Sequence, residues 1–314
     1  MARDRKPLTD PPESARKAAL DVARVVASHG RHVVVETPEG TRVRCHPRGK
    51  KSECVVGDLV RWQPSGDEGV IEAVEPRRNL LYRQDEWRSK SFAANVDQLL
   101  MVVAADPPFS ESQLARALIA AADAGIAASL VLNKIDRPEA DAARQRLLPY
   151  RSMGTPVLEL AAKADPQQAL ALLRPLLDGR STLILGPSGA GKSTLINLLV
   201  PGARAAVGEV SQALSSGRHT TTSTTWYWLD DTHRAAVIDS PGFQEFGLRQ
   251  VDATRLAALM PDLAAELGQC RFHNCTHREE PQCGVRAAVE AGRIAPGRWR
   301  IYQELFAECS QPRW

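Results

Sequence analysis

A glycine-rich run, GPSGAGKST, occupies residues 186–194 and carries the residue types best suited to chemistry in this chain. It fits the phosphate-loop pattern G-x-x-x-x-G-K-[S/T], in which backbone N–H groups and a helix N-terminus cradle anionic phosphates. Lys192 is expected to reach the β- and γ-phosphates, and the Ser193 hydroxyl to ligate Mg²⁺. An apolar run before the loop predicts a buried strand and the run after it predicts a helix, which disfavours a chance glycine-rich turn. The expected phosphate contacts are Gly186, Pro187, Ser188, Gly189, Ala190, Gly191, Lys192, Ser193 and Thr194.

The tetrapeptide Asn133-Lys-Ile-Asp136 follows another apolar stretch that predicts a buried strand. It resembles the N-K-x-D motif with which GTPases recognise guanine. The Asp136 carboxylate can accept hydrogen bonds from N1–H and the 2-amino group of guanine, whereas adenine offers neither donor. Asn133 is expected to brace the loop, and the Lys134 stem to lie over the ring. Four letters are a weak signal alone, but beside a phosphate loop they indicate GTP rather than ATP.

Two further stretches resemble nucleotide-binding loops of GTPases. Ala161-Ala-Lys163 resembles the S-A-K loop, with Ala161 in place of the usual serine. The backbone N–H of Ala162 is therefore expected to face the guanine oxygen, with Lys163 beside it. Asp239-Ser-Pro-Gly242 resembles the D-x-x-G motif, in which Asp239 would hold the Mg²⁺ shell through water and the Gly242 N–H would sense the γ-phosphate.

A threonine-rich stretch, Gly217-Arg-His-Thr-Thr-Thr222, lies between the phosphate loop and the D-x-x-G stretch. One threonine is expected to close on Mg²⁺ as the first switch; Thr222 is our choice, but the sequence does not distinguish it from Thr220 and Thr221. Common GTPases place a water-orienting glutamine directly after D-x-x-G, where this chain has Phe243. Intrinsic hydrolysis is therefore expected to be slow. His219 is the candidate for positioning the water; a loop histidine that contacts RNA or solvent is the open alternative.

The order of these motifs is unusual. In an ordinary GTPase the phosphate loop comes first and N-K-x-D comes late, whereas here the base motif at 133–136 and the 161–163 loop precede residues 186–194. The alternation of predicted strands and helices indicates a doubly wound, largely parallel α/β sheet, which binds ligands at the carboxyl ends of its strands. The same sheet can be built from a circularly permuted chain, and we predict that arrangement.

The elements before this core predict a small β-domain. Residues 21–80 show short strands separated by glycine turns, the size of a closed barrel such as an OB-fold. The stretch 41–51 is basic and contains no acidic residue, so we expect it to follow an RNA backbone, with a merely solvated basic loop as the alternative. Residues 1–20 predict a flexible basic arm that is either solvated or in contact with RNA. Basic and aromatic residues for which RNA contact is also expected are Arg77, Arg78, Tyr82, Arg83, Trp87, Arg88, Lys90 and Phe92.

The C-terminal segment, residues 251–314, contains three cysteines and a histidine with the spacing C-x4-C-x-H-x5-C: Cys270, Cys275, His277 and Cys283. This set predicts a tetrahedral zinc site whose four positions are all filled by protein, and which is therefore structural rather than catalytic. His273 is the alternative histidine ligand, and disulfide pairing is the less favoured interpretation. Helices are expected on both sides, over 253–267 and 285–291.

Bulk composition is that of an ordinary globular protein. The chain has 314 residues, 43% hydrophobic and 25% charged, and a net charge of +3, so any nucleic-acid surface must be local. No apolar N-terminal signal and no run long enough to span a membrane are present, which predicts a cytoplasmic protein without membrane contact. Six cysteines in that compartment indicate metal binding more than disulfides.

Taken together, the motifs and their order resemble the RsgA (YjeQ) family of GTPases over about residues 20–290. The resemblance implies an N-terminal OB-fold at 21–80, a circularly permuted P-loop GTPase domain at 81–250 and a zinc-binding α-helical domain at 251–314. It also implies GTP hydrolysis to GDP and phosphate stimulated by the small ribosomal subunit, contact with its rRNA, and a role in late maturation of that subunit. We expect a monomer. Two other functions stay open: a GTPase acting on another RNA or on the large subunit, and a non-hydrolysing nucleotide-gated RNA-binding module.

Overall fold

The computed structural model describes residues 20–29, 32–49, 54–84, 89–203, 224–242 and 246–311. The chain divides into two compact units, residues 1–78 and 79–314. The residues proposed for the first switch and for water positioning, Thr220, Thr221, Thr222 and His219, lie outside the described residues, as do Phe243 and residues 1–19 of the arm. The finer division of the chain into four segments stays a prediction.

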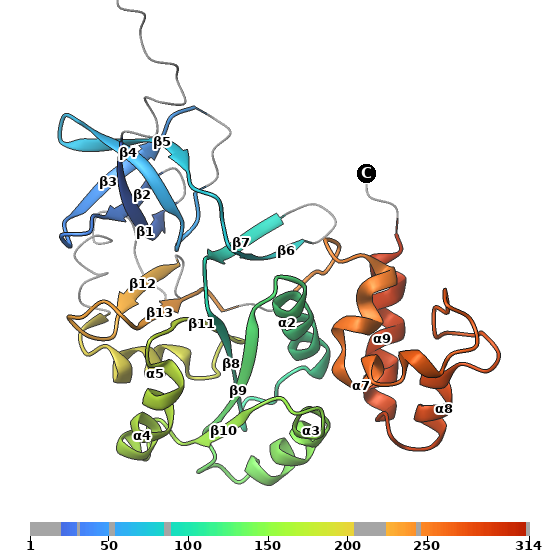
Figure 1. Ribbon diagram of the computed structural model, residues 1–314. Coiled ribbons are helices and arrows are strands. Elements are labelled where there is room, and N and C mark those ends of the chain that lie inside the picture. Colours follow the sequence, from blue (N-terminus) through green and yellow to red (C-terminus); the bar gives the residue numbers. More distant parts are fainter. Residues whose placement is uncertain are drawn as a thin grey trace, which may run out of the picture. The chain divides into compact units, whose positions relative to one another are not determined.

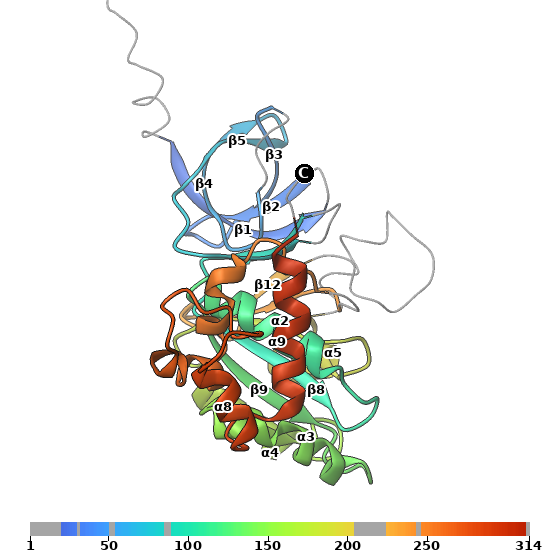
Figure 2. The same cartoon turned by 90° about the vertical axis from the view of Figure 1, so that its right-hand side faces the viewer.

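Five strands form a closed barrel in the first unit: β1 Asp21–His29, β2 His32–Glu36, β3 Arg42–Pro47, β4 Leu59–Ser65 and β5 Glu68–Val74. The pairs β1–β2, β2–β3 and β4–β5 are antiparallel, and β3–β5 is parallel. An antiparallel β1–β4 pair closes the ring, which Figure 2 shows nearly end-on. The predicted OB-like barrel is confirmed.

The barrel interior is filled by alternate side chains of its strands, as the two-residue period of a strand requires. Val35, Val60 and Trp62 are among the buried residues. A Cβ on Gly69 would lie 2.5 Å from the Cys45 sulfur and 2.8 Å from the Trp62 ring, so only glycine leaves room for the indole at this point of β5.

The second unit contains a six-stranded portion of sheet in the order β10-β9-β8-β11-β13-β12. Its strands are β8 Gln98–Ala104, β9 Ala127–Asn133, β10 Val157–Leu160, β11 Ser181–Leu185, β12 Thr225–Trp228 and β13 Ala236–Asp239. All neighbours are parallel except β12, which runs antiparallel to β13. Apolar runs rather than alternating patterns form these strands because helices cover both faces of the sheet (Figure 1).

In the part of this domain that the structure describes, the helices that pack on the sheet are α2 Glu111–Asp123, α3 Ala140–Ser152, α4 Pro166–Leu177 and α5 Lys192–Leu199. The Ser110 side chain caps α2 by accepting from Gln113 N, and the Asp165 side chain caps α4 by accepting from Gln168 N. Leu100 and Val102 of β8 pack with α4 and α5 in one buried cluster. The mixed composition of α3 gives little amphipathic signal, so the sequence pattern did not predict this helix.

Nucleotide motifs meet at one edge of the sheet because they follow the carboxyl ends of parallel strands. Strand β9 ends at Asn133, β10 at Leu160, β11 at Leu185 and β13 at Asp239. The strand that carries the phosphate loop thus lies centrally, although it is the fourth strand of the sheet along the chain. This is the expected site edge of a doubly wound sheet, built in permuted order.

The C-terminal part of the second unit, residues 251–311, contains only short turns and helices as regular elements. It comprises η1 Ala253–Leu259, α7 Pro261–Ala264, η2 Leu267–Gln269, α8 Gly284–Glu290 and α9 Pro296–Cys309. The helical segment predicted over 285–291 is confirmed by α8, whereas the one predicted over 253–267 is helical only in short pieces. Met260 adopts an extended conformation (φ −112°, ψ 104°) because the following Pro261 disfavours helical geometry before it, so the segment breaks into short turns.

A hairpin of β6 Leu80–Gln84 and β7 Ser89–Ala94 precedes the sheet, in the stretch for which RNA contact was expected. Phe92 is buried and its ring stacks on Phe246, with centroids 5.6 Å apart. In the first unit, Arg77 forms a two-bond ion pair with the buried Asp58 (2.7 and 2.9 Å). Phe92 is therefore a core residue and not the surface aromatic that was expected. Trp87 and Arg88 lie outside the described residues, and RNA contact by the rest of this stretch stays a prediction. Among the described residues, no helix is long and apolar enough to cross a membrane.

Candidate functional site

The glycine-rich loop between β11 and α5 approaches neighbouring backbone so closely that side chains are excluded. Gly186 has a φ of +155°, and a Cβ there would lie 2.1 Å from the Val102 carbonyl oxygen. Gly191 has a φ of +96°, and a Cβ would lie 2.2 Å from Asn133 Nδ2. Both glycines of the motif pattern are thus required by the fold, and the loop delivers Lys192 as the first residue of α5.

Lys192 is a buried cation whose ammonium lies inside this loop. Its Nζ donates to the carbonyl oxygens of Gly186 (2.8 Å) and Pro187 (3.0 Å). Burial lowers the pKa of Lys192, and the Asp239 carboxylate acts in the opposite direction. A Cβ on Gly242 would lie 3.1 Å from the same Nζ, so the D-x-x-G stretch borders the phosphate loop. A buried positive charge bounded by two glycine loops is suited to an oligophosphate.

Asn133 joins three of the predicted motifs through its buried amide. Its Nδ2 donates to the carbonyl oxygen of Ala190 in the phosphate loop (3.0 Å), and its Oδ1 accepts from Ala162 N in the 161–163 loop (3.1 Å). The bracing expected of Asn133 is therefore present. Because the Ala162 N–H already donates to this brace, its expected contact with a guanine oxygen stays a prediction, as does the role of Lys163.

The base side of the site includes residues that the sequence analysis missed. Lys134 has a φ of +62°, and its Nζ donates to the Asp106 carbonyl oxygen (2.7 Å). The next residue, Pro107, would lie 3.4 Å from a Cβ on Gly189 of the phosphate loop. A signal was available, since two prolines follow the apolar strand that ends at residue 104. Asp136 keeps 42% of its side chain exposed, with Arg137 Nε 4.0 Å away, so its carboxylate is accessible to a base.

The D-x-x-G stretch, Asp239–Gly242, starts at the buried end of β13. Asp239 is buried, and Ser240 donates from its hydroxyl to the Ile184 carbonyl oxygen at 2.9 Å. The Ser240 hydroxyl therefore ties this turn to the end of β11. The carboxylate of Asp239 and the hydroxyl of Ser193, at the first turn of α5, are oxygen donors of the kind that Mg²⁺ prefers.

Cys270, Cys275, His277 and Cys283 form a cluster whose ligand atoms all lie within 4.8 Å of one another. His277 Nδ1 is 3.4 Å from the Cys270 sulfur and 3.6 Å from the Cys283 sulfur, and these two sulfurs are 4.0 Å apart. Tetrahedral zinc with its usual bond lengths requires edges of roughly 3.5–3.8 Å, so the residues fit that metal. His273 is exposed and is not part of the cluster, which decides between the two candidate histidines.

Electrostatics of the cluster also favour a cation at its centre. Burial raises the pKa of Cys275 to about 12, and the neighbouring thiols of Cys283 and Cys270 act in the same direction. Thiols in this position resist ionisation unless a positive charge stabilises their thiolates, which a metal ion does. Tyr302 of α9 donates to the Thr276 carbonyl oxygen (2.7 Å), so α9 supports the loop that holds the cluster.

Glu280 closes the same loop and gives it a predicted pH dependence. Burial by itself would raise its pKa, but hydrogen bonds from the Thr276 side chain and from the backbone of Thr276 and Arg278 lower it to about 2, from an ordinary 4.5. Since the folded-state pKa is depressed, the stabilisation is present above pH 4.5 and is lost as the pH falls towards 2. Glu280→Gln should therefore lower the thermal midpoint at neutral pH, and the difference from wild type should shrink below pH 4.5. A difference that stays constant across that range would contradict the role of the charge.

Basic residues on barrel strand β3, and Arg48 directly after it, have acidic partners on adjacent strands. Arg42 pairs with Glu36 (2.8 Å), and Arg48 pairs with Glu72 (2.7 Å). Arg44 and His46 both approach Glu68, at 3.4 and 3.6 Å. The stretch 41–51 contains no acidic residue, but β2 and β5 supply them, so the described part of this face is less positive than its sequence indicates.

Comparison with known proteins agrees with this geometry. The model of the RsgA GTPase family matches residues 74–249. The small ribosomal subunit biogenesis GTPase RsgA of Variovorax paradoxus (strain S110) is 59% identical over 316 residues, covering 98% of this chain and 99% of that protein. The protein of the same name from Burkholderia pseudomallei (strain K96243) is 52% identical over 301 residues, covering 95% of each.

Two solved structures are similar over almost the whole chain. YjeQ from Thermotoga maritima has a TM-score of 0.70 at 30% identity, covering 93% of this chain and 99% of that one. YloQ, a circularly permuted GTPase, has a TM-score of 0.67 at 25% identity, covering 94% of this chain and 97% of that one. With its motifs in permuted order at one sheet edge, this GTP-hydrolysing chain belongs to the RsgA GTPase family.

Proposed function

We propose that this GTPase binds the small ribosomal subunit, assists its late maturation, and hydrolyses GTP to GDP and phosphate as the switch for its release. The observation that supports GTP binding is the pair of hydrogen bonds made by the Asn133 amide. They connect the base motif to the phosphate loop and to the 161–163 loop. Support for the ribosomal half comes from the relatives, which are named small ribosomal subunit biogenesis GTPases and are similar from end to end.

In the proposed reaction, the phosphate loop and Lys192 hold the β- and γ-phosphates, and Asp136 selects guanine by accepting from N1–H and the 2-amino group. Ser193, Asp239 and a threonine of 220–222 would hold Mg²⁺, which when bound neutralises charge that develops on the phosphate oxygens. Gly242 reports the γ-phosphate through its N–H. His219 remains our candidate for positioning the attacking water, because Phe243 has no group that could do so.

We further propose that the cysteine and histidine cluster holds one structural Zn²⁺. Four protein ligands leave no position for a substrate, so the metal stabilises the loop and takes no part in hydrolysis. The loop has little apolar core of its own, since residues 271–274 are all exposed, and metal binding is the natural source of its stability.

The decisive measurement is GTP turnover by the pure protein alone and with isolated small subunits, large subunits or whole ribosomes. We expect slow turnover alone and strong stimulation by small subunits, with no comparable turnover of ATP. Lys192→Ala, measured in parallel, should abolish the activity and so exclude a contaminating GTPase. Stimulation by large subunits only, or by none of these particles, would refute the assignment in favour of another RNA or protein partner.

A further inference from the structure

The chain that follows the D-x-x-G loop is buried almost at once, in a stretch that we call the anchor segment, residues 246–251. Phe246, Leu248 and Val251 are each at most 1% exposed. Phe246 stacks on Phe92 of β7 with ring planes 11° apart. Only residues 243–245 separate this segment from Gly242. The position of Gly242 is therefore restrained by the buried Phe246, four residues further along the chain.

The backbone of the anchor segment is bonded to the β6–β7 hairpin. Gln84 donates its N–H to the Gly247 carbonyl oxygen (3.3 Å) and accepts from Arg249 N (3.0 Å), which makes a short parallel bridge. The Gln250 side chain donates to the Tyr82 carbonyl oxygen (3.1 Å). These bonds fix one side of the segment to the start of the second unit.

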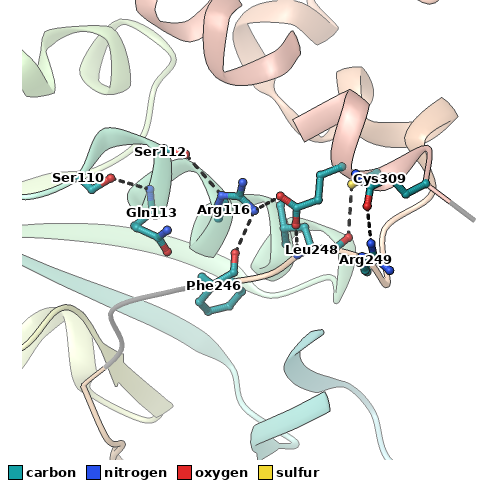
Figure 3. Close-up of polar contacts among 10 residues, drawn as sticks. Ser110, Ser112, Gln113, Arg116, Phe246, Leu248, Arg249 and Cys309 are labelled. Atoms are coloured by element: carbon teal, nitrogen blue, oxygen red, sulfur yellow. Dashed lines mark hydrogen bonds and ion pairs between the residues drawn. The ribbon is translucent and has the colours of Figure 1, made fainter. Parts of the chain in front are cut away.

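On its other side the segment is held by Arg116 and Glu308, and also by Cys309 of α9, whose thiol donates to the Leu248 carbonyl oxygen at 3.4 Å (Figure 3). Arg116 of α2 donates from Nη1 to the Phe246 carbonyl oxygen at 3.2 Å, and the same nitrogen lies 2.6 Å from Glu308 Oε2 on α9. Glu308 Oε1 in turn accepts from Leu248 N at 3.1 Å. Ser112 Oγ accepts from Arg116 Nε at 3.4 Å. One ion pair thus binds a carbonyl and an N–H of the anchor segment together.

Burial makes these contacts interdependent. Arg116 and Glu308 keep only 14% and 24% of their side chains exposed. If the anchor segment moved, both charged groups would lose a backbone partner in a poorly hydrated place, which is unfavourable. The arrangement therefore favours one position of the anchor segment. That position fixes the point at which the loop that carries Gly242 ends.

We propose that Arg116 and Glu308 are positioning residues for GTP hydrolysis. By fixing the anchor segment, they hold the loop of Gly242 in one position relative to the phosphate loop, and they connect that loop to α9. Neither residue belongs to a nucleotide-binding motif. The proposal rests on the proposed role of Gly242 as the sensor of the γ-phosphate. Because α9 also supports the metal loop through Tyr302, the Arg116–Glu308 pair connects the nucleotide site with the C-terminal segment, residues 251–314.

The test separates the rate of the chemical step from nucleotide affinity. In single-turnover hydrolysis by the pure, zinc-loaded protein, Arg116→Ala should lower the rate constant about tenfold or more, the usual scale for losing a charge-assisted hydrogen bond. Dissociation constants for GTP and GDP should change by less than about twofold, since no phosphate or base contact is altered. Arg116→Lys keeps the charge but not the fork geometry, and should fall between the two.

Two variants guard against a trivial loss of folding. Arg255→Ala breaks a second ion pair between α2 and the C-terminal segment, in which Arg255 Nη1 lies 2.8 Å from Asp123 Oδ1. This change does not alter a contact of the anchor segment. It should leave the rate unchanged. Glu308→Gln keeps an acceptor for Leu248 N and removes only the charge, so it should slow hydrolysis less than Arg116→Ala while zinc content and thermal midpoint stay near those of Arg255→Ala.

The charge-exchanged double variant R116E/E308R restores an ion pair but supplies no donor to Phe246 and no acceptor to Leu248. We expect it to stay slow. Full rescue by the exchange would overturn the proposal, because docking of α9 alone would then matter. Rates equal in Arg116→Ala, Arg255→Ala and wild type would also overturn it, whereas absence of turnover in the wild type would refute the proposed function instead.

Discussion

Replacing Gly191 by alanine is expected to weaken GTP and GDP binding by at least about a hundredfold. The residue has a φ of +96°, and the added Cβ would lie 2.2 Å from Asn133 Nδ2. A left-handed alanine costs about 1–2 kcal/mol. Displacing Asn133 also removes its bonds to Ala190 and Ala162, each worth about 1–3 kcal/mol when a buried partner is left unpaired. Nucleotide titration with a fluorescent GDP analogue measures the effect.

Gly154→Ala provides the matched control. Gly154 also has a left-handed backbone (φ +80°), but nothing lies within 4 Å of its added Cβ. It therefore carries the backbone strain without the collision, and should lower stability slightly while leaving nucleotide affinity unchanged. Equal loss of affinity in both variants would show that strain alone matters and that the junction through Asn133 does not.

Replacing His277 by alanine is expected to cost the protein its bound zinc and the folded structure of the metal loop. His277 supplies the one nitrogen of the cluster, with Nδ1 between two sulfurs at 3.4 and 3.6 Å. Structural zinc sites contribute apparent binding free energies of about 10–16 kcal/mol in isolated zinc-finger peptides, so loss of a ligand unfolds small loops. Metal content by mass spectrometry and amide hydrogen exchange over 270–283 report the change.

The other histidine of the loop serves as the control here. His273 is exposed and lies outside the cluster, and His273→Ala should retain one zinc per chain with unchanged exchange protection. A chelator should reproduce the His277→Ala state in the wild type. If His273→Ala loses zinc while His277→Ala keeps it, the cluster is assigned to the wrong histidine.

The nucleotide edge could be predicted because each motif sits where an apolar strand ends. The apolar runs 129–132 and 181–185 predict buried strands, and the loops after them had to meet at one edge of a parallel sheet. Spacing likewise identified the three cysteines of the cluster, whereas choosing between His273 and His277 needed coordinates.

Contacts between distant segments could not be predicted. Arg116 and Glu308 are separated by 192 residues, and each alone is an ordinary charged residue on a helix. Phe92 resembled a surface aromatic because its neighbours Arg83 and Lys90 are basic, yet its ring packs on Phe246. A strand pattern records which face is apolar, but not which remote side chain will cover it.

The carboxylates that pair with Arg42 and Arg48 affect how the barrel would bind a polyanion. An arginine that is already paired with Glu36 or Glu72 must leave that partner before it contacts a phosphate, so binding exchanges one ion pair for another. Fewer counterions are then released than the number of arginines implies, and the salt dependence of affinity becomes shallower than for an unpaired basic surface. Such a surface binds a polyanion reversibly, as the release from the small ribosomal subunit that we propose requires.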